Sequence, residues 1–274
     1  MTTSPATAHS AKTIPSPVRV TGLSGEPVSV DVVDIGEGLP MVFLHGLAGL
    51  NEHWEEVTRR AANRARCIML ELPLLELRGD DCSIHGATEL TIDFLERFVH
   101  TPSVLVGNSF GGHVALRIAL DRPDLVRGLI LAGSSGLIER TTVSEIQIRP
   151  TRPWLEEKIG ELFFDRSKMK AADVDRAFQQ LSDRHHARAM VRLSRSARKN
   201  HLGDRIGEIK APTLLIWGKQ DVVTPPEACH ELKAKIRNSR VLWFESCGHA
   251  PMLECPEQFG DAMCDFIAEL DRRA

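Results

Sequence analysis

The sequence predicts an α/β protein built on a doubly wound, mostly parallel sheet with an inserted helical segment. Short apolar runs rich in β-branched residues alternate with stretches whose apolar residues recur at helical spacing. Several of these runs are apolar throughout, which is typical of strands covered on both faces. The alternation is interrupted once, over residues 137–206. Alternating strands and helices favour a parallel sheet with helices on both sides.

The predicted strands all lie in such apolar runs. They are residues 28–33, 41–44, 67–70, 104–106, 129–132, 214–217 and 241–244. The predicted helices lie between them, with Pro or Gly near many of their ends. They are residues 54–63, 87–99, 111–121, 226–236 and 256–270.

The interruption predicts the domain organisation. Residues 137–206 contain no convincing strand, and their charged, helix-favouring sequence predicts three or four helices. We therefore expect a helical cap at 137–206, inserted into a core formed by residues 18–136 and 207–274. Residues 1–17 are rich in Ser, Thr, Ala and Pro and lack the apolar stretch of a signal peptide, so we expect a disordered tail.

Composition excludes several functional classes. The net charge of −3 over 274 residues gives no reason to expect nucleic acid as a partner. No apolar run approaches the roughly 20 residues that span a bilayer, so no membrane association is expected. The six cysteines form no C-x-x-C pair and no zinc-site spacing, which predicts buried free thiols and a cytoplasmic protein. The oligomeric state is not indicated.

Residues 107–112, with the sequence GNSFGG, contain the pattern G-x-S-x-G between a predicted strand and a predicted helix. A serine in such a turn is pushed out of the top of the sheet, often with strained backbone angles. Side chains at Gly107 or Gly111 would collide where strand and helix pack closely. The pattern predicts that Ser109 is a nucleophile.

Residues 45–49, with the sequence HGLAG, follow the predicted strand 41–44. A glycine-rich turn at the carboxyl end of a strand leaves backbone N–H groups that point into a cleft. Acyl transfer needs such donors, because negative charge develops on the substrate oxygen. We expect the oxyanion hole to consist of the N–H groups of Leu47 and Phe110. His45 is interpreted as a residue that braces the loop.

Asp221 and His249 each follow a late predicted strand, and His249 lies in a loop flanked by glycine and proline. A serine hydroxyl needs a base within hydrogen-bond reach, because it is barely ionised near neutral pH. His249 would take that proton, and Asp221 would hold the imidazole in the required tautomer. The chain order Ser109, Asp221, His249 is typical of a catalytic triad in this kind of sheet. Such a mechanism requires no metal and no organic cofactor.

These motifs together resemble those of the α/β-hydrolase superfamily, specifically its capped members. The resemblance extends from Val18 to the C-terminus and rests on HGLAG, Trp54, GNSFGG, LLIWGKQD and CGHAPMLECPEQF. It implies the fold and the triad but not the substrate, since one fold serves many reactions. The stretch 71–78 lacks the glycines of the D-x-P-G-x-G-x-S loop of many relatives. A serine at position 109 argues against dehalogenase or epoxide-hydrolase chemistry, where the resembling enzymes use aspartate.

Asn108 leaves the reaction open. The sequence GNSFGG is similar to the elbow of hydrolases that cleave carbon–carbon bonds in ring-fission products, whose substrates carry carboxylates. Residues 139–205 contain 15 Lys and Arg against 10 Asp and Glu. Asn108, Arg188 and Arg192, with Arg198, could therefore contact an acidic substrate, although the solvated faces of cap helices are the commoner place for such arginines. Ala250 follows His249, whereas an aromatic residue commonly does in that group.

Three functions follow from these observations. The leading prediction is a serine hydrolase of the esterase type that cleaves a small carboxylic ester through an acyl-enzyme. The first alternative is hydrolysis of a carbon–carbon bond in a vinylogous diketo acid by the same triad. The second alternative is a ligand-binding protein that retains the triad but turns over poorly. All three take a small molecule as substrate or ligand.

Overall fold

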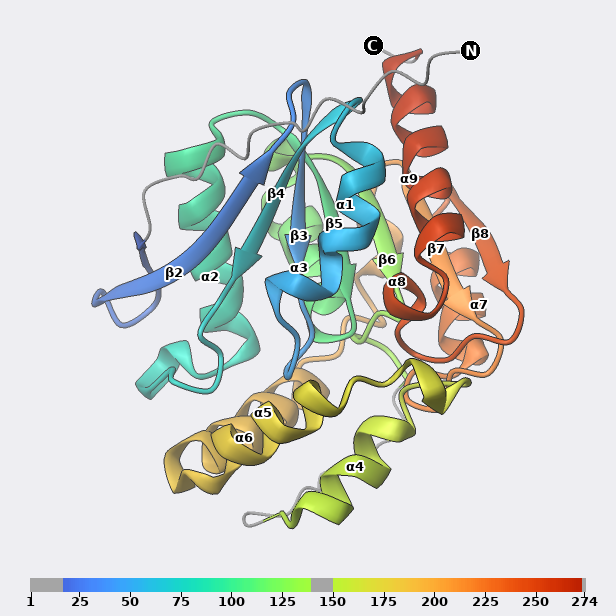
Figure 1. Cartoon of the computed structure of the whole chain (residues 1–274). Helices are drawn as coiled ribbons and strands as arrows, with labels where there is room; N and C mark the ends of the chain where they lie inside the picture. The colour runs from blue at the N-terminus through green and yellow to red at the C-terminus, as the bar shows by residue number, and fades with distance from the viewer. Residues whose placement is uncertain (1–16, 139–149, 273–274) are drawn as a thin grey trace, which may run out of the picture.

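A computed structural model of the chain describes residues 17–138 and 150–272 (Figure 1). Nearly all of the expected disordered tail, residues 1–17, lies outside the described residues. The part of the expected cap between 139 and 149 also lies outside them.

The centre of the molecule is an eight-stranded sheet with the order β1-β2-β4-β3-β5-β6-β7-β8. Strands β3 to β8 are parallel to one another, and β1 and β2 are antiparallel at one edge. The strands are β1 (Val18–Thr21), β2 (Pro27–Ile35), β3 (Leu39–Leu44), β4 (Ala65–Glu71), β5 (Ser103–Asn108), β6 (Val126–Ala132), β7 (Thr213–Gly218) and β8 (Ser239–Phe244). The mostly parallel sheet confirms the predicted fold class, and all seven predicted strands are present.

Helices cover both faces of the sheet, as the continuous apolar strands predict (Figure 1). One face packs on α1 (Glu55–Ala61), α8 (Pro251–Glu254) and α9 (Pro256–Asp271). The other face packs on α2 (Ile84–Phe94), α3 (Phe110–Asp121) and α7 (Pro226–Lys235). Each layer buries its own apolar cluster against the sheet, so the sheet forms a rigid platform with its carboxyl edge free for a site.

Short helical turns complete the core and account for the differences at the predicted helix ends. A 3₁₀ turn, η1 (Asn51–Trp54), precedes α1, and a π-helical turn, η3 (Leu95–Val99), extends α2. Helix α2 begins three residues before the predicted start, because the hydroxyl of Ser83 accepts a hydrogen bond from the N–H of Gly86. The described part of the chain also contains the 3₁₀ turns η2 (Gly79–Asp81), η4 (Pro123–Leu125), η6 (Arg166–Lys168) and η7 (Ile206–Glu208).

Between β6 and β7 the described residues are helical, with no strand among them. They form α4 (Arg152–Gly160), α5 (Ala171–Ser182) and α6 (Arg184–Lys199). Figure 1 shows these helices beyond the sheet, on the side where the parallel strands end. We call α4 to α6 the cavity roof, because they line the cavity beside Ser109 that is described below. The description of residues 137–206 as a separate cap stays a prediction.

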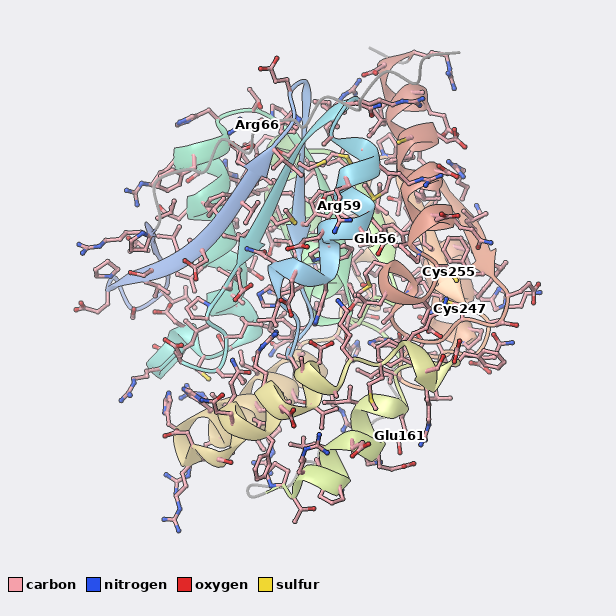
Figure 2. The ribbon with its side chains drawn as sticks, viewed as in Figure 1. Glu56, Arg59, Arg66, Glu161, Cys247 and Cys255 are labelled. Carbon is pink, nitrogen blue, oxygen red and sulfur yellow. The ribbon has the colours of Figure 1, made fainter. Side chains whose placement is uncertain are left out.

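The cysteines are free thiols, as predicted, and only Cys255 is not fully buried. Burial raises the pKa of the Cys67 thiol to about 12 and that of Cys229 to about 12. Cys247, in the loop between β8 and α8, and Cys255, directly after α8, are labelled in Figure 2, and burial raises the pKa of each thiol. Among the described residues, no helix is long and apolar enough to cross a membrane.

Candidate active site

Ser109 occupies the turn between β5 and α3 and has φ 52° and ψ −119°, a strained conformation for a residue other than glycine. Its N–H donates to the carbonyl of Ala132 at 3.2 Å, and its own carbonyl accepts from the N–H groups of His113 and Ser135. The elbow is therefore anchored to the neighbouring strand.

The predicted reason for the two glycines of the elbow is confirmed. A Cβ atom on Gly107 would lie 2.6 Å from the carbonyl oxygen of Gly111. A Cβ atom on Gly111 would lie 2.1 Å from the carbonyl oxygen of Leu44. Only glycine allows strand and helix to approach this closely.

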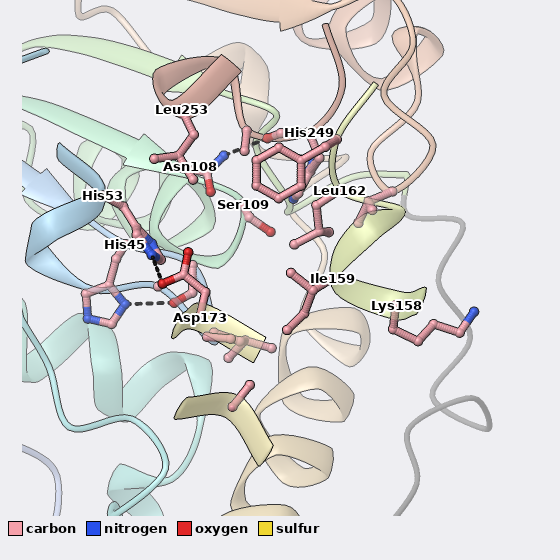
Figure 3. Close-up of a pocket in the computed structure, with 18 of the residues that line it drawn as sticks. His45, His53, Asn108, Ser109, Lys158, Ile159, Leu162, Asp173, His249 and Leu253 are labelled. Carbon is pink, nitrogen blue, oxygen red and sulfur yellow. Dashed lines mark hydrogen bonds and ion pairs between the residues drawn. The ribbon is translucent and has the colours of Figure 1, made fainter. Parts of the chain in front are cut away.

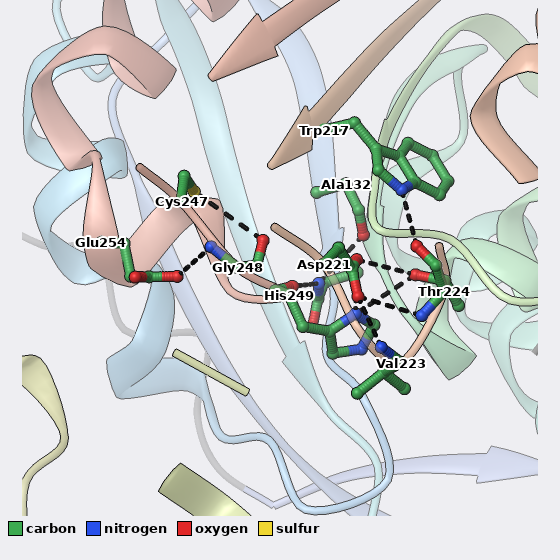
Figure 4. Close-up of polar contacts among 10 residues, drawn as sticks. Ala132, Trp217, Asp221, Val223, Thr224, Cys247, Gly248, His249 and Glu254 are labelled. Carbon is green, nitrogen blue, oxygen red and sulfur yellow. Dashed lines mark hydrogen bonds and ion pairs between the residues drawn. The ribbon is translucent and has the colours of Figure 1, made fainter. Parts of the chain in front are cut away.

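Asp221 and His249 form a buried pair, in which His249 Nδ1 lies 2.9 Å from Asp221 Oδ2 (Figure 4). The other carboxylate oxygen of Asp221 accepts from the N–H groups of Val223 at 2.9 Å and Thr224 at 3.0 Å. The Thr224 hydroxyl donates to Asp221 Oδ2 at 2.9 Å. These donors fix the carboxylate, and the carboxylate in turn orients the imidazole.

Gly133, which sequence reasoning missed, makes room for this pair. It follows β6 with φ 49°, and a Cβ atom there would lie 2.9 Å from Asp221 Oδ2 and 3.0 Å from His249 Nδ1. The only indication in the sequence was that this glycine directly follows a predicted central strand. The close approach itself arises only from tertiary structure.

The HGLAG turn lies against the elbow. The N–H of Gly49 donates to the carbonyl of Gly46, and a Cβ atom on Gly46 would lie 3.4 Å from the Cβ of Ser109. Leu47 lies inside this turn. Phe110 begins α3, so its N–H is one of the first four of a helix and has no intrahelical acceptor.

His45 makes the contacts of a bracing residue. Its Nδ1 donates to the carbonyl of Gly46 at 2.7 Å, and its Nε2 accepts from the N–H of Leu72 at 3.1 Å. Burial lowers the pKa of His45, which favours the neutral ring that this pattern of one donor and one acceptor requires.

A cavity of about 300 Å³ opens beside Ser109 and His249 (Figure 3). Its wall is mainly apolar and combines the core with α4 to α6. The apolar lining residues include Leu47, Trp54, Trp154, Ile159, Leu162, Phe163, Ala177, Met190, Met252 and Leu253. The cavity therefore suits a small, largely apolar molecule.

A cluster of polar side chains in the cavity wall brings together residues of η1 and α5. His53 Nε2 lies 3.6 Å from Asp173 Oδ1, which is longer than a hydrogen bond. Glu52 completes a cluster with the donor types of a metal site. Arg176 already supplies positive charge there, 2.7 Å from Glu52 and 3.9 Å from Asp173. The expectation that no metal is needed stays a prediction.

Asn108, expected to contact the substrate, also makes hydrogen bonds within the protein. Its side-chain amide donates to the carbonyl of Ala132 at 2.9 Å and to the carbonyl of His249 at 3.1 Å. Asn108 lines the cavity, but its NH₂ group ties the elbow to the histidine loop.

The expected substrate contacts of Arg188 and Arg192 need correction. Both line a separate groove beside Cys82 and Ser83 and are absent from the lining of the Ser109 cavity. The physical reason is the amphipathic pattern of α6. Its buried apolar residues, Met190 among them, face the protein, so the arginines point away from the cavity.

Glu254 is a second residue that sequence reasoning missed. Its buried carboxylate accepts from the N–H groups of Gly248 at 2.6 Å, Phe164 at 2.8 Å and Asp165 at 3.1 Å. Its carbonyl also accepts from the ammonium of Lys168. Figure 4 shows Glu254 facing Gly248, one residue before His249. Its place in the CGHAPMLECPEQF motif was the only signal in the sequence.

Comparisons with known proteins identify the family. The model of the alpha/beta hydrolase family matches residues 41–262. Pimeloyl-[acyl-carrier protein] methyl ester esterase of Nitrosomonas europaea is 28% identical, over 84% of this chain and 96% of its own. The 2-hydroxy-6-oxononadienedioate/2-hydroxy-6-oxononatrienedioate hydrolase of Paraburkholderia xenovorans is 29% identical, over 92% of this chain and 94% of its own.

A solved alpha/beta hydrolase from the metagenome of lagoon sediments at Mar Chica, Morocco, is 28% identical with a TM-score of 0.72, covering 88% of this chain and 96% of its own. A serine hydrolase involved in carbazole degradation is 25% identical with a TM-score of 0.78, covering 92% of this chain and 99% of its own. The chain therefore belongs to the alpha/beta hydrolase family, and it is a hydrolase.

Proposed function

We propose that this hydrolase is a serine esterase that cleaves a small carboxylic ester through an acyl-enzyme. The observation that carries the proposal is the 2.9 Å contact of His249 with Asp221, beside a cavity that Ser109 and His249 both line. Ser109 is the nucleophile, and its strained elbow points the hydroxyl into that cavity.

His249 acts as the general base and then as the general acid. Because Nδ1 faces Asp221, the proton on Nδ1 is held there and Nε2 is left to accept the proton of the serine hydroxyl. The same nitrogen later returns that proton to the leaving alcohol. Asp221 keeps the tautomer and stabilises the imidazolium that forms in between.

The N–H groups of Leu47 and Phe110 form the oxyanion hole. They come from the turn beside Ser109 and from the first residue of α3, so both would donate to the oxygen of the carbonyl group that Ser109 attacks. Removing one such donor in other hydrolases costs about 10²–10³ in kcat. After the alcohol leaves, water attacks the acyl group on Ser109 with His249 again as base.

Hydrolysis of a carbon–carbon bond is the second candidate. It is favoured by the 29% identity to the Paraburkholderia xenovorans hydrolase, whose name describes a ring-fission acid as substrate. The ester is preferred because Arg188 and Arg192, the cations expected to meet the carboxylates of such a substrate, lie outside the cavity. The ester substrate of the Nitrosomonas europaea relative supports the same choice.

A fluorophosphonate probe tests the nucleophile, because it reacts covalently with an activated serine. We expect the wild type to be labelled and the Ser109→Ala variant to be neither labelled nor active on aryl esters, with an unchanged melting temperature. An unlabelled but folded wild type would favour the ligand-binding alternative. A purified enzyme that bleaches a coloured ring-fission dienoate but spares aryl esters would establish the second candidate instead.

A further inference from the structure

Helix α6 carries an unusual charge pattern that the reaction at Ser109 does not use. Its sequence RHHARAMVRLSRSARK contains six Lys and Arg residues and no acidic residue. Several of these cations are four residues apart, a spacing at which like charges weaken a helix. The helix is retained against this repulsion because its apolar face packs into the protein.

Four of these cations line one open groove of about 620 Å³, on the side of α6 away from the Ser109 cavity. They are Arg188, Arg192, Arg195 and Lys199, and all four are exposed. The opposite wall of the groove contains Cys82 and Ser83, where η2 leads into α2.

Within residues 17–138 and 150–272, none of these four side chains has a carboxylate partner. Other cations of the same region are paired. Arg176 contacts Glu52 at 2.7 Å, and Arg205 contacts Asp121 at 2.8 Å. The groove therefore carries uncompensated positive charge on a protein whose net charge is −3.

We propose that this groove docks an acidic helix of a partner protein along the outer face of α6. The four cations lie within twelve residues, with about 16 Å between the first and the last at 1.5 Å per residue. A partner helix with carboxylates at the same spacing would meet all four, whereas a single phosphate would reach only one or two. Charge complementarity of this kind speeds association and selects the partner.

A membrane surface fits these observations less well. Five of the apolar residues of α6 are buried in the protein, and Val191, which is partly exposed in the groove, offers too little apolar surface to insert between lipids. The site is also a groove with a second wall and not a protruding ridge. Met190 on the same helix lines the Ser109 cavity, so a docked partner would lie across the cavity wall. The proposal does not depend on which bond Ser109 cleaves.

Fluorescence anisotropy of a labelled helical peptide tests the proposal, with glutamates at positions i, i+4, i+7 and i+11. We expect the full-length protein to bind it with a steep dependence on salt. The double variant Arg188→Glu/Arg192→Glu should bind at least about tenfold more weakly. The double variant Arg64→Glu/Arg237→Glu changes charge equally at exposed sites outside the groove and should bind like the wild type.

Each other outcome overturns the proposal. If both double variants bound the peptide with the same affinity, the binding would depend on the net charge of the protein and not on the groove. Displacement of the peptide by low millimolar inorganic phosphate would indicate a small-anion site. Binding to phosphatidylglycerol vesicles without binding to the peptide would indicate a membrane surface. Hydrolysis of a neutral aryl ester serves as the folding control, and its rate should be the same in all variants because the groove residues do not line the cavity.

Discussion

At the scale of single residues, the sequence indicates the proposed reacting groups more clearly than the residues that make room for them. Ser109, Asp221 and His249 are recognisable because each follows a strand in a glycine- or proline-containing segment. Gly133 also follows a strand, but that position alone does not indicate why a glycine is needed there. Its importance comes from a close approach to Asp221 and His249, which belong to segments far along the chain.

Replacing Gly133 by Ala should impair catalysis through this close approach. The added methyl carbon would lie 2.9 Å from Asp221 Oδ2 and 3.0 Å from His249 Nδ1, so the pair must separate or turn. We expect kcat for an aryl ester to fall by at least about tenfold, because a tenfold loss needs only about 1.4 kcal/mol of the barrier. Steady-state kinetics measures this.

Gly79→Ala is the matched control for backbone strain. Gly79 has φ 52°, close to the 49° of Gly133, but a Cβ atom there meets no atom within 4 Å. The left-handed backbone conformation should therefore destabilise both variants by the same free energy, about 1 kcal/mol. An equal loss of kcat in the two variants would show that backbone strain, and not the collision with the pair, is responsible.

At the scale of elements, the histidine loop is held by a contact that the sequence does not reveal. The carboxylate of Glu254, in α8, joins the loop at Gly248 to the segment after α4 at Phe164 and Asp165. The N–H of His249 also donates to the carbonyl of Leu162 at 2.8 Å. The position of the proposed base thus depends on the segment that carries the cavity roof, about ninety residues away in the chain.

Removing the Glu254 carboxylate should weaken both the fold and the reaction. In Glu254→Ala the buried N–H of Gly248 loses its acceptor, which costs about 1–3 kcal/mol, and the partly buried N–H groups of Phe164 and Asp165 lose theirs at a lower cost, because water can replace the acceptor. We expect a lower melting temperature and a lower kcat with little change in KM. Glu254→Gln keeps one acceptor oxygen and should recover part of both quantities.

The exposed neighbour Glu257 provides the control for the loss of a carboxylate on this part of the chain. Its side chain is 80% exposed, and its contact with Arg60 is 4.0 Å long. Glu257→Ala should therefore leave kcat and stability unchanged. If Glu254→Ala lowered the melting temperature but kept the wild-type rate of fluorophosphonate labelling, Glu254 would be purely structural.

At the scale of the whole molecule, strand periodicity was sufficient to predict the sheet. Strand β1 was missed because it is only four residues long and pairs at the antiparallel edge. The charge count of residues 139–205 likewise leaves the orientation of the arginines on α6 open. Total charge does not show which face a side chain occupies, whereas the buried stripe of Ala187, Met190 and Leu193 would have placed the arginines outward.

Stability should fall as the pH is lowered below about 6.5, because the fold buries neutral histidines. His113 is fully buried, and burial, with Arg117 nearby, lowers its pKa to about 3. Burial also lowers the pKa of His45 and His85. A folded pKa below the unfolded value of about 6.5 means that the stability conferred by the neutral ring is complete above pH 6.5 and is lost between 6.5 and about 3.

His113 alone should remove about 2 kcal/mol of unfolding free energy between pH 6.5 and pH 5, at about 1.4 kcal/mol per pH unit. Urea unfolding at the two pH values measures this. His113→Leu should make the unfolding free energy less dependent on pH. Neither ring nitrogen of His113 has a hydrogen-bond partner among the described residues, so an apolar side chain there breaks no hydrogen bond.

The exposed His230 is the control, and His230→Gln should keep the full wild-type dependence. A pH dependence equally steep in His113→Leu and the wild type would contradict the assignment, because the proton uptake on unfolding would then come from other groups.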